Sequence, residues 1–136
     1  MGYVNTKITL KNSKDIFKAE VGMIQKSEIR QATVDVMVDT GASMLVINEQ
    51  LYQQFGLGFI EERETTFAND TKEMCKITEP LVIKWEDRTT TMPALVVGNV
   101  SDLLLGVLPL EGMDLIVDTV NQKLIGAHGK QPVYRV

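Results

Sequence analysis

Cysteine and histidine are almost absent from this sequence of 136 residues. The single cysteine, Cys75, makes an internal disulfide impossible, and nothing favours an oxidising compartment. We interpret Cys75 as a small strand residue, because no activating partner is evident. The only histidine, His128, has no cysteine or histidine partner for a zinc site. A serine or cysteine nucleophile would have to use His128 as its base, and no nucleophile-elbow motif is present.

Long apolar runs and clusters of basic residues are also missing. No run approaches the ~20 residues that a membrane span needs, and there is no signal-peptide core, so we expect no membrane partner. The 14 basic and 18 acidic residues give a net charge of −4 without a basic stripe. Nucleic acid is therefore not an expected partner. Cofactor motifs are absent, so we expect no cofactor and no metal, and we expect a cytoplasmic location.

The length and composition fit a folded globular chain. A hydrophobic content of 44% excludes wholesale disorder. A chain of this length can bury a core without disulfides or metal. No repeat, linker or low-complexity stretch interrupts it, and we expect residues 1–136 to form a single domain.

The most informative stretch is an apolar strand that ends in an acid. The β-branched run before Asp39 is typical of a buried strand, and Thr40 and Gly41 follow the acid directly. A carboxylate there is costly unless it is hydrogen-bonded or keeps a proton. Gly41 lets the backbone turn so that main-chain N–H groups point at the acid. An ordinary Asp-Thr-Gly turn is an equally good interpretation of these residues alone.

A second motif makes the pattern specific. Residues 38–43 are followed by Leu-Leu-Leu-Gly-Val-Leu-Pro-Leu-Glu at 103–111 and by Leu-Ile-Val-Asp at 115–118. In this order and spacing the motifs resemble those of retropepsin-like aspartic proteases, over roughly residues 29–125. The resemblance implies an all-β structure: a small closed barrel-like acid-protease fold with one or two short helices.

The resemblance also implies an aspartic endopeptidase that acts on a peptide or protein substrate. Such enzymes use two carboxylates that share a proton, one as the base on a water and the other as a donor to the scissile carbonyl. This chain has one credible copy, so a homodimer would supply the second Asp39 by symmetry. By the same resemblance, Thr40 braces the opposite loop and Gly41 donates its N–H, which gives Asp39, Thr40 and Gly41 as the predicted catalytic residues.

A hairpin of residues 61–67 and 71–77 falls where the family has its flap, the ribbon that closes over the substrate. Retroviral flaps are glycine-rich at the tip, whereas this tip has none, so a plain surface hairpin stays an open alternative. The loop at 98–102 borders the substrate groove in the family. The predicted substrate-binding residues are Ala42, Ser43, Ala68, Asn69, Asp70, Val100 and Leu104.

The sequence departs from the family in three places. Ala42 gives no hydroxyl to the outer carboxylate oxygen, which follows the retroviral pattern. Retroviral enzymes often carry an acid where Ser43 stands and an arginine where Val107 stands, and this ion pair is missing here. A retroviral style of dimer interface is therefore not expected. A non-catalytic dimerisation or protein-interaction module on the same fold is the alternative function, because fold does not fix function. Asp118 is followed by Thr119 but not by glycine, so we interpret it as a turn residue.

The remaining pattern predicts short strands joined by turns. We expect strands at 3–10, 16–24, 29–38, 45–47, 81–85, 89–97, 103–105 and 115–118, besides the hairpin above. A helix of about two turns is predicted between Asn48 as N-cap and Gly56 as C-terminal stop, and a short one near Pro109. Residues 127–136 fit either a loose tail or a strand of a dimer interface.

Overall fold

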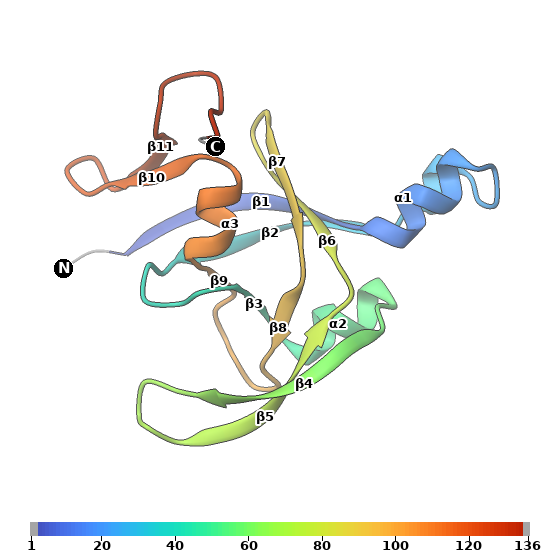
Figure 1. Ribbon diagram of the computed structural model, residues 1–136, viewed down its shortest axis with the longest axis horizontal. Coiled ribbons are helices and arrows are strands. Elements are labelled where there is room, and N and C mark those ends of the chain that lie inside the picture. Colours follow the sequence, from blue (N-terminus) through green and yellow to red (C-terminus); the bar gives the residue numbers. More distant parts are fainter. Residues whose placement is uncertain (1–2, 135–136) are drawn as a thin grey trace.

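The structure, a computed structural model, describes residues 3–134. Its helices are α1 (Ser13–Glu20), α2 (Glu49–Phe55) and α3 (Val107–Gly112), with a 3-10 turn at Lys26–Glu28 (Figure 1). Its strands are β1 (Val4–Asn12), β2 (Gln31–Val38), β3 (Leu45–Ile47), β4 (Phe59–Thr66), β5 (Lys72–Thr78), β6 (Leu81–Trp85), β7 (Arg88–Met92), β8 (Ala94–Val96), β9 (Leu104–Leu105), β10 (Leu115–Asp118) and β11 (Lys123–Gly126).

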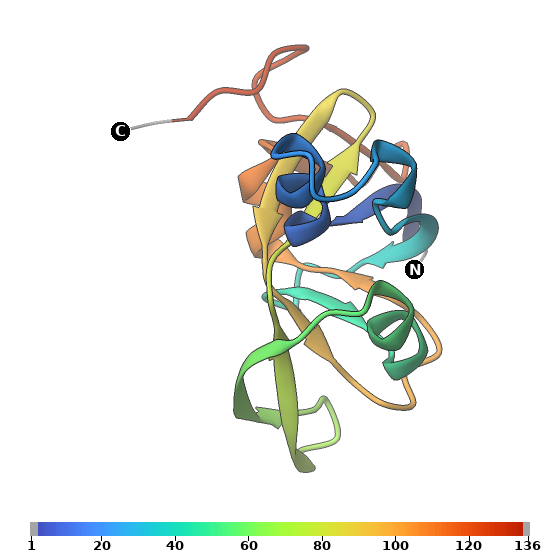
Figure 2. The same ribbon diagram turned by 90° about the vertical axis from the view of Figure 1, so that its right-hand side faces the viewer.

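Nine strands form one sheet in the order β4-β5-β8-β3-β9-β2-β1-β6-β7, and β10 pairs with β11 in a second. The predicted all-β class is confirmed, with three short helices where one or two were expected. The expected closed ladder is not formed within residues 3–134, because β4 and β7 end the order unpaired. Only Ile77 and Leu95 pair between β5 and β8, so the β4–β5 hairpin projects from the body (Figure 2).

The core follows from strand alternation. Ile8 and Leu10 of β1 are 1% and 0% exposed, whereas Lys7, the residue before Ile8, faces solvent. The short strand β3 lies inside the sheet between β8 and β9 and is buried at all three positions. A strand that is buried on both faces is expected to be apolar throughout, as β3 is.

The predicted strand at 16–24 is wrong, because the chain forms helix α1 there. The side chain of Asn12 accepts a hydrogen bond from the N–H of Asp15 at 3.1 Å and so caps the helix. The carboxylate of Asp15, in the first turn, accepts hydrogen bonds from Nε and the backbone N–H of Arg30. Phe17 is 61% exposed, so this apolar residue, which suggested strand alternation, contributes little to the core.

Most other local predictions are confirmed. Helix α2 is capped by the Asn48 side chain, which accepts from the N–H of Leu51 at 2.8 Å. It stops at Gly56, whose φ of 61° is left-handed. The predicted strand at 89–97 is interrupted, because Pro93 separates β7 from β8. Asp118 accepts from the N–H groups of Val120 and Asn121 and is a turn residue, as expected.

The described part of the C-terminal segment, 127–134, forms no strand and is attached to the body. Asp114 accepts hydrogen bonds from the Val133 N–H and from His128 Nδ1. The buried guanidinium of Arg88 donates to the carbonyls of Asp114 and Gly129. Residues 135–136, also covered by the tail prediction, lie outside the described residues. Across residues 3–134, no helix has both the length and the apolar surface to cross a membrane.

Candidate active site

Backbone pairing places Asp39 at the end of β2. Val38 pairs with Leu105 in the parallel β2–β9 ladder, and the N–H of Asp39 donates to the Leu105 carbonyl at 3.0 Å. The Asp39 side chain is half-buried, and its Oδ1 accepts the N–H of Gly41 at 2.9 Å. This is the backbone donor that the sequence predicted for Gly41.

The segment after Asp39 is fixed by the segment around Gly106. The N–H groups of Gly106, Val107 and Leu108 donate to the carbonyls of Met44, Ala42 and Ser43, at 3.1, 2.9 and 2.9 Å. A Cβ on Gly106 would lie 2.6 Å from two of these carbonyl oxygens, so no larger residue fits without displacement. The two sequence motifs thus form one structural unit, which fits the spacing argument.

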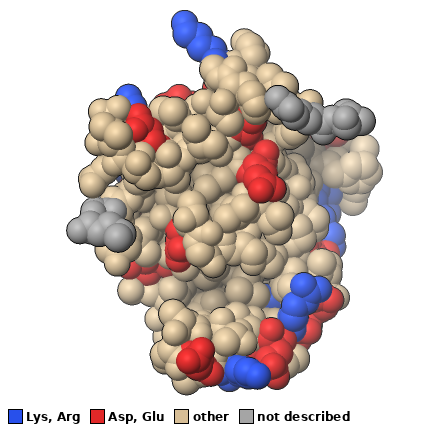
Figure 3. Space-filling view, turned by 60° about the vertical axis from the view of Figure 1, so that its left-hand side comes forward, with Lys and Arg blue, Asp and Glu red and all other residues tan. Residues whose placement is uncertain are grey.

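Asp39 lies in a groove of about 860 Å³ between this unit and the β4–β5 hairpin. That volume is large enough for several side chains of an extended peptide. Figure 3 shows the hollow above the lower lobe, which is the β4–β5 hairpin, and its floor is mostly uncharged. The predicted residues that line the groove are Asp39, Gly41, Ala42, Ser43, Ala68, Asn69, Val100 and Leu104.

Two predicted site residues do not line the groove. The side chain of Thr40 is exposed and makes no hydrogen bond within residues 3–134. Asp70 sits at the hairpin tip with a left-handed φ of 65°. Its role there is conformational, because a tight turn needs one residue in that region and no glycine is available.

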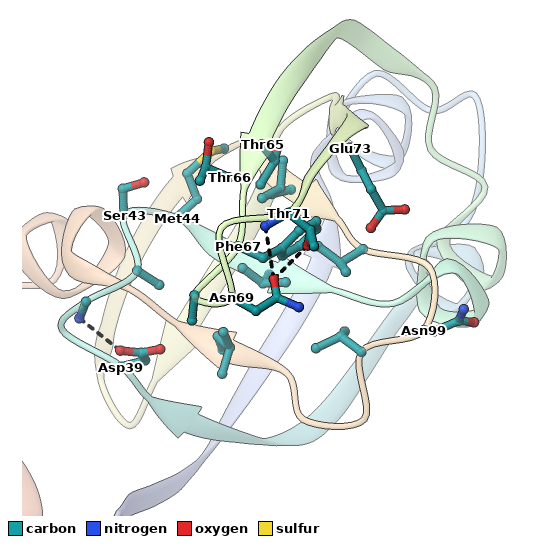
Figure 4. A pocket seen from close by; sticks show the side chains of 18 of the residues that line it. Asp39, Ser43, Met44, Thr65, Thr66, Phe67, Asn69, Thr71, Glu73 and Asn99 are labelled. Atoms are coloured by element: carbon teal, nitrogen blue, oxygen red, sulfur yellow. Dashed lines mark hydrogen bonds between the residues drawn. The ribbon is translucent and has the colours of Figure 1, made fainter.

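The glycine-free tip is stabilised by Asn69. Its side-chain oxygen accepts hydrogen bonds from the N–H of Thr71 at 3.2 Å and from the Thr71 hydroxyl at 2.6 Å (Figure 4). The backbone closes the turn with a bond from the Phe67 N–H to the Thr71 carbonyl at 2.9 Å. The tip therefore keeps a defined shape opposite the Asp39 loop without the glycines of retroviral flaps.

Sequence reasoning missed part of the groove. Its further lining residues are Met44, Val46, Thr65, Thr66, Phe67, Thr71, Glu73, Leu95, Val97, Gly98 and Asn99. The apolar floor comes from β3 and β8, which run parallel with Val46 opposite Leu95. No local sequence pattern indicates that β3 pairs with β8. Glu73 could have been found, because it shares one face of β5 with Cys75 and Ile77, which are buried.

The groove of one chain contains a single aspartate, Asp39. Among residues 3–134, Asp39 and Glu73 are the only acids that line it, and they lie at opposite ends of the view in Figure 4. Asp118 lies outside the groove, and hydrogen bonds from Asn121 hold the pKa of its carboxyl below the usual value. Among the described residues no group of three His, Cys, Asp or Glu side chains could hold a metal ion.

Comparison with known proteins agrees with this geometry. Residues 26–111 match the family model described as "gag-polyprotein putative aspartyl protease", which spans both motifs. The chain belongs to the retropepsin-like family of aspartic proteases. A solved structure of a retropepsin-like aspartic protease from Rickettsia conorii is similar in fold, with a TM-score of 0.50 and 16% identity. The similarity covers 87% of this chain and 90% of that one. No curated protein matches the chain.

The Asp39 loop and the β4–β5 hairpin line the same groove. The matched region begins before β2 and ends in α3, so it contains the acid, the hairpin and the Gly106 segment. The β10–β11 hairpin and the attached C-terminal segment lie beyond the matched region.

Proposed function

We propose that the protein is an aspartic endopeptidase whose active site forms between two copies of the chain. The observation that carries the proposal is a carboxylate held by the Gly41 N–H inside a groove that has no second acid beside it. A two-fold axis through the Asp39 loops would bring the two Asp39 carboxylates together. The exposed Thr40, whose side chain makes no hydrogen bond within residues 3–134, would then meet its counterpart loop.

In this dimer the two carboxylates share one proton, because two neighbouring negative charges cannot both form cheaply. The ionised Asp39 takes a proton from a water as it attacks the peptide carbonyl. The protonated Asp39 donates to the carbonyl oxygen, and Gly41 keeps the carboxylate in position. The β4–β5 hairpin covers an extended peptide that lies along the groove. We also propose that residues 1–136 act as one domain in the cytoplasm, which suits the free, buried Cys75.

The alternative is a protein-interaction module that binds peptides or a second copy without cleaving them. Ser43 and Val107 occupy the positions of the retroviral interface ion pair, so the dimer of either function needs other contacts there. Both functions use the same groove and the same dimer, so only chemistry separates them.

The deciding experiment compares Asp39→Asn with Asp35→Asn on a mixture of peptides. The amide is nearly isosteric with the acid but cannot activate water, so Asp39→Asn should abolish cleavage while the protein stays folded. Asp35 belongs to the same strand but is exposed and paired with Lys7 at 2.8 Å, so its variant should cleave like the parent. Wild-type cleavage by Asp39→Asn would remove the enzyme assignment.

A further inference from the structure

Glu73 is the one charged side chain of the groove that the catalytic proposal does not use. It lies on β5, on the same face as Cys75 and Ile77, which are 6% and 4% exposed. That face is therefore the one turned toward the body of the protein. Glu73 is the last residue of this face before the hairpin tip, where the face leaves the core and meets the groove.

No cation within the described chain neutralises Glu73. Among the acids of the hairpin, Glu61 pairs with Arg63 and Glu64 with Lys72. Glu62, Asp70 and Glu73 make no ion pair within residues 3–134, and of these three only Glu73 lines the groove. Its partner across the β4–β5 ladder is Thr65, which also lines the groove and carries no charge. The Glu73 carboxylate is thus a free negative charge at the border of a substrate groove.

The rest of the groove is mostly uncharged, with apolar residues along its floor. Met44, Val46, Leu95 and Val97 provide that apolar surface, and Asp39 is the only other charged residue of the lining. In Figure 4 Glu73 lies on the side of the groove where Asn99 also lies, well away from Asp39. The lining therefore offers an apolar surface and one carboxylate, that of Glu73, apart from Asp39.

We infer that Glu73 selects substrates with a lysine or arginine at one position some residues from the scissile bond, next to apolar residues at the bond itself. The inference rests on the proposed function, because it assigns substrate specificity to the same groove. Side chains of an extended peptide alternate in direction, so on each side of the scissile bond only one peptide position is expected to reach a Glu73 carboxylate. In a two-fold dimer each copy contributes one Glu73, so a basic residue is favoured on both sides of the bond.

The test is a positional peptide library cleaved by the wild type and by Glu73→Gln, Glu73→Lys and Glu62→Gln. Glu62 is the matched control, because it lies on the same hairpin opposite Lys76, on the face turned away from Glu73 and Thr65. The wild type and the control should cleave peptides with Lys or Arg at the selected position roughly fivefold to tenfold faster than neutral ones. Glu73→Gln should lose this preference, and Glu73→Lys should favour Asp or Glu there.

A binding arm separates this inference from the enzyme assignment. Fluorescently labelled basic and neutral library peptides are titrated against Asp39→Asn and against Asp39→Asn with Glu73→Gln. Tighter binding of basic peptides to the first protein only, roughly fivefold to tenfold, supports the role of Glu73 even if no peptide is cleaved. Equal binding of basic and neutral peptides by Asp39→Asn overturns the inference, as does an unchanged cleavage preference in Glu73→Gln.

Discussion

The substitution Gly106→Ala tests how the active-site loop is held. Gly106 is buried and has an ordinary φ of −90°, so the backbone conformation does not require glycine. What requires it is space. An added Cβ would lie 2.6 Å from the carbonyl oxygens of Ala42 and Met44 and 2.8 Å from the Met44 nitrogen. All three are backbone atoms, so no side-chain rotation can relieve the overlap.

The expected cost follows from what has to move. The loop after Asp39 must shift away from the Gly106 segment, and overpacking of this kind costs about 1–3 kcal/mol. The same shift lengthens the hydrogen bonds from Gly106 and Val107 to that loop, each worth about 1 kcal/mol. We therefore expect Gly106→Ala to lower the free energy of unfolding by about 3 kcal/mol, and to reduce cleavage because Asp39 is displaced.

Urea denaturation followed by tryptophan fluorescence measures this loss, with Gly98→Ala as the control. A Cβ on Gly98 meets no atom within 4 Å and its φ is not left-handed, so its variant should unfold within about 0.5 kcal/mol of the parent. If Gly106→Ala unfolded at the same urea concentration as Gly98→Ala, the argument that the loop depends on this close backbone approach would be wrong.

Two further predictions concern an ion pair and the dimer. The Asp15 carboxyl, 2% exposed as a residue, has a pKa below its usual value because Arg30 donates to it. The contribution of Asp15 to stability is therefore complete above the pKa of the unfolded chain, about 3.9, and is lost as pH falls through the lower pKa of the folded protein. The difference in unfolding free energy between the wild type and Asp15→Asn should therefore shrink in acid. Thr40→Ala should weaken the dimer in sedimentation, so that on dilution activity is lost at a higher protein concentration than for the parent. The stability of the monomer should not change, because Thr40 makes no side-chain hydrogen bond within residues 3–134. An unchanged dimer would contradict the bracing role of Thr40.

Elements with strong local signals could be predicted from the sequence. Asn48 and Gly56 mark the ends of α2 because a capping side chain and a left-handed stop act within a few residues. The turn at Asp118 is likewise settled by bonds to the next residues along the chain. The meeting of the Asp39 loop with the Gly106 segment was predictable only through the family resemblance.

Features that depend on distant partners could not be predicted. Helix α1 relies on Asp15, whose partner Arg30 comes after a loop, so its apolar residues were interpreted as strand alternation. The groove floor depends on the parallel pairing of β3 with β8, and short apolar strands carry no signal for which neighbour they choose. The attachment of the C-terminal segment needs Arg88 at the start of β7 together with Asp114, which lies between α3 and β10.

The loop that carries Asp39 is held mainly by backbone groups. The Asp39 N–H donates to the Leu105 carbonyl, the Asp39 carbonyl accepts the Ala42 N–H, and the Asp39 carboxylate accepts the Gly41 N–H. Backbone bonds constrain residue identity only where space is short, as at Gly106. Side chains around the loop can therefore change widely while the acid keeps its place. The specificity of this chain should then lie where side chains do face the groove, on the apolar strands of its floor and at Glu73 on the hairpin.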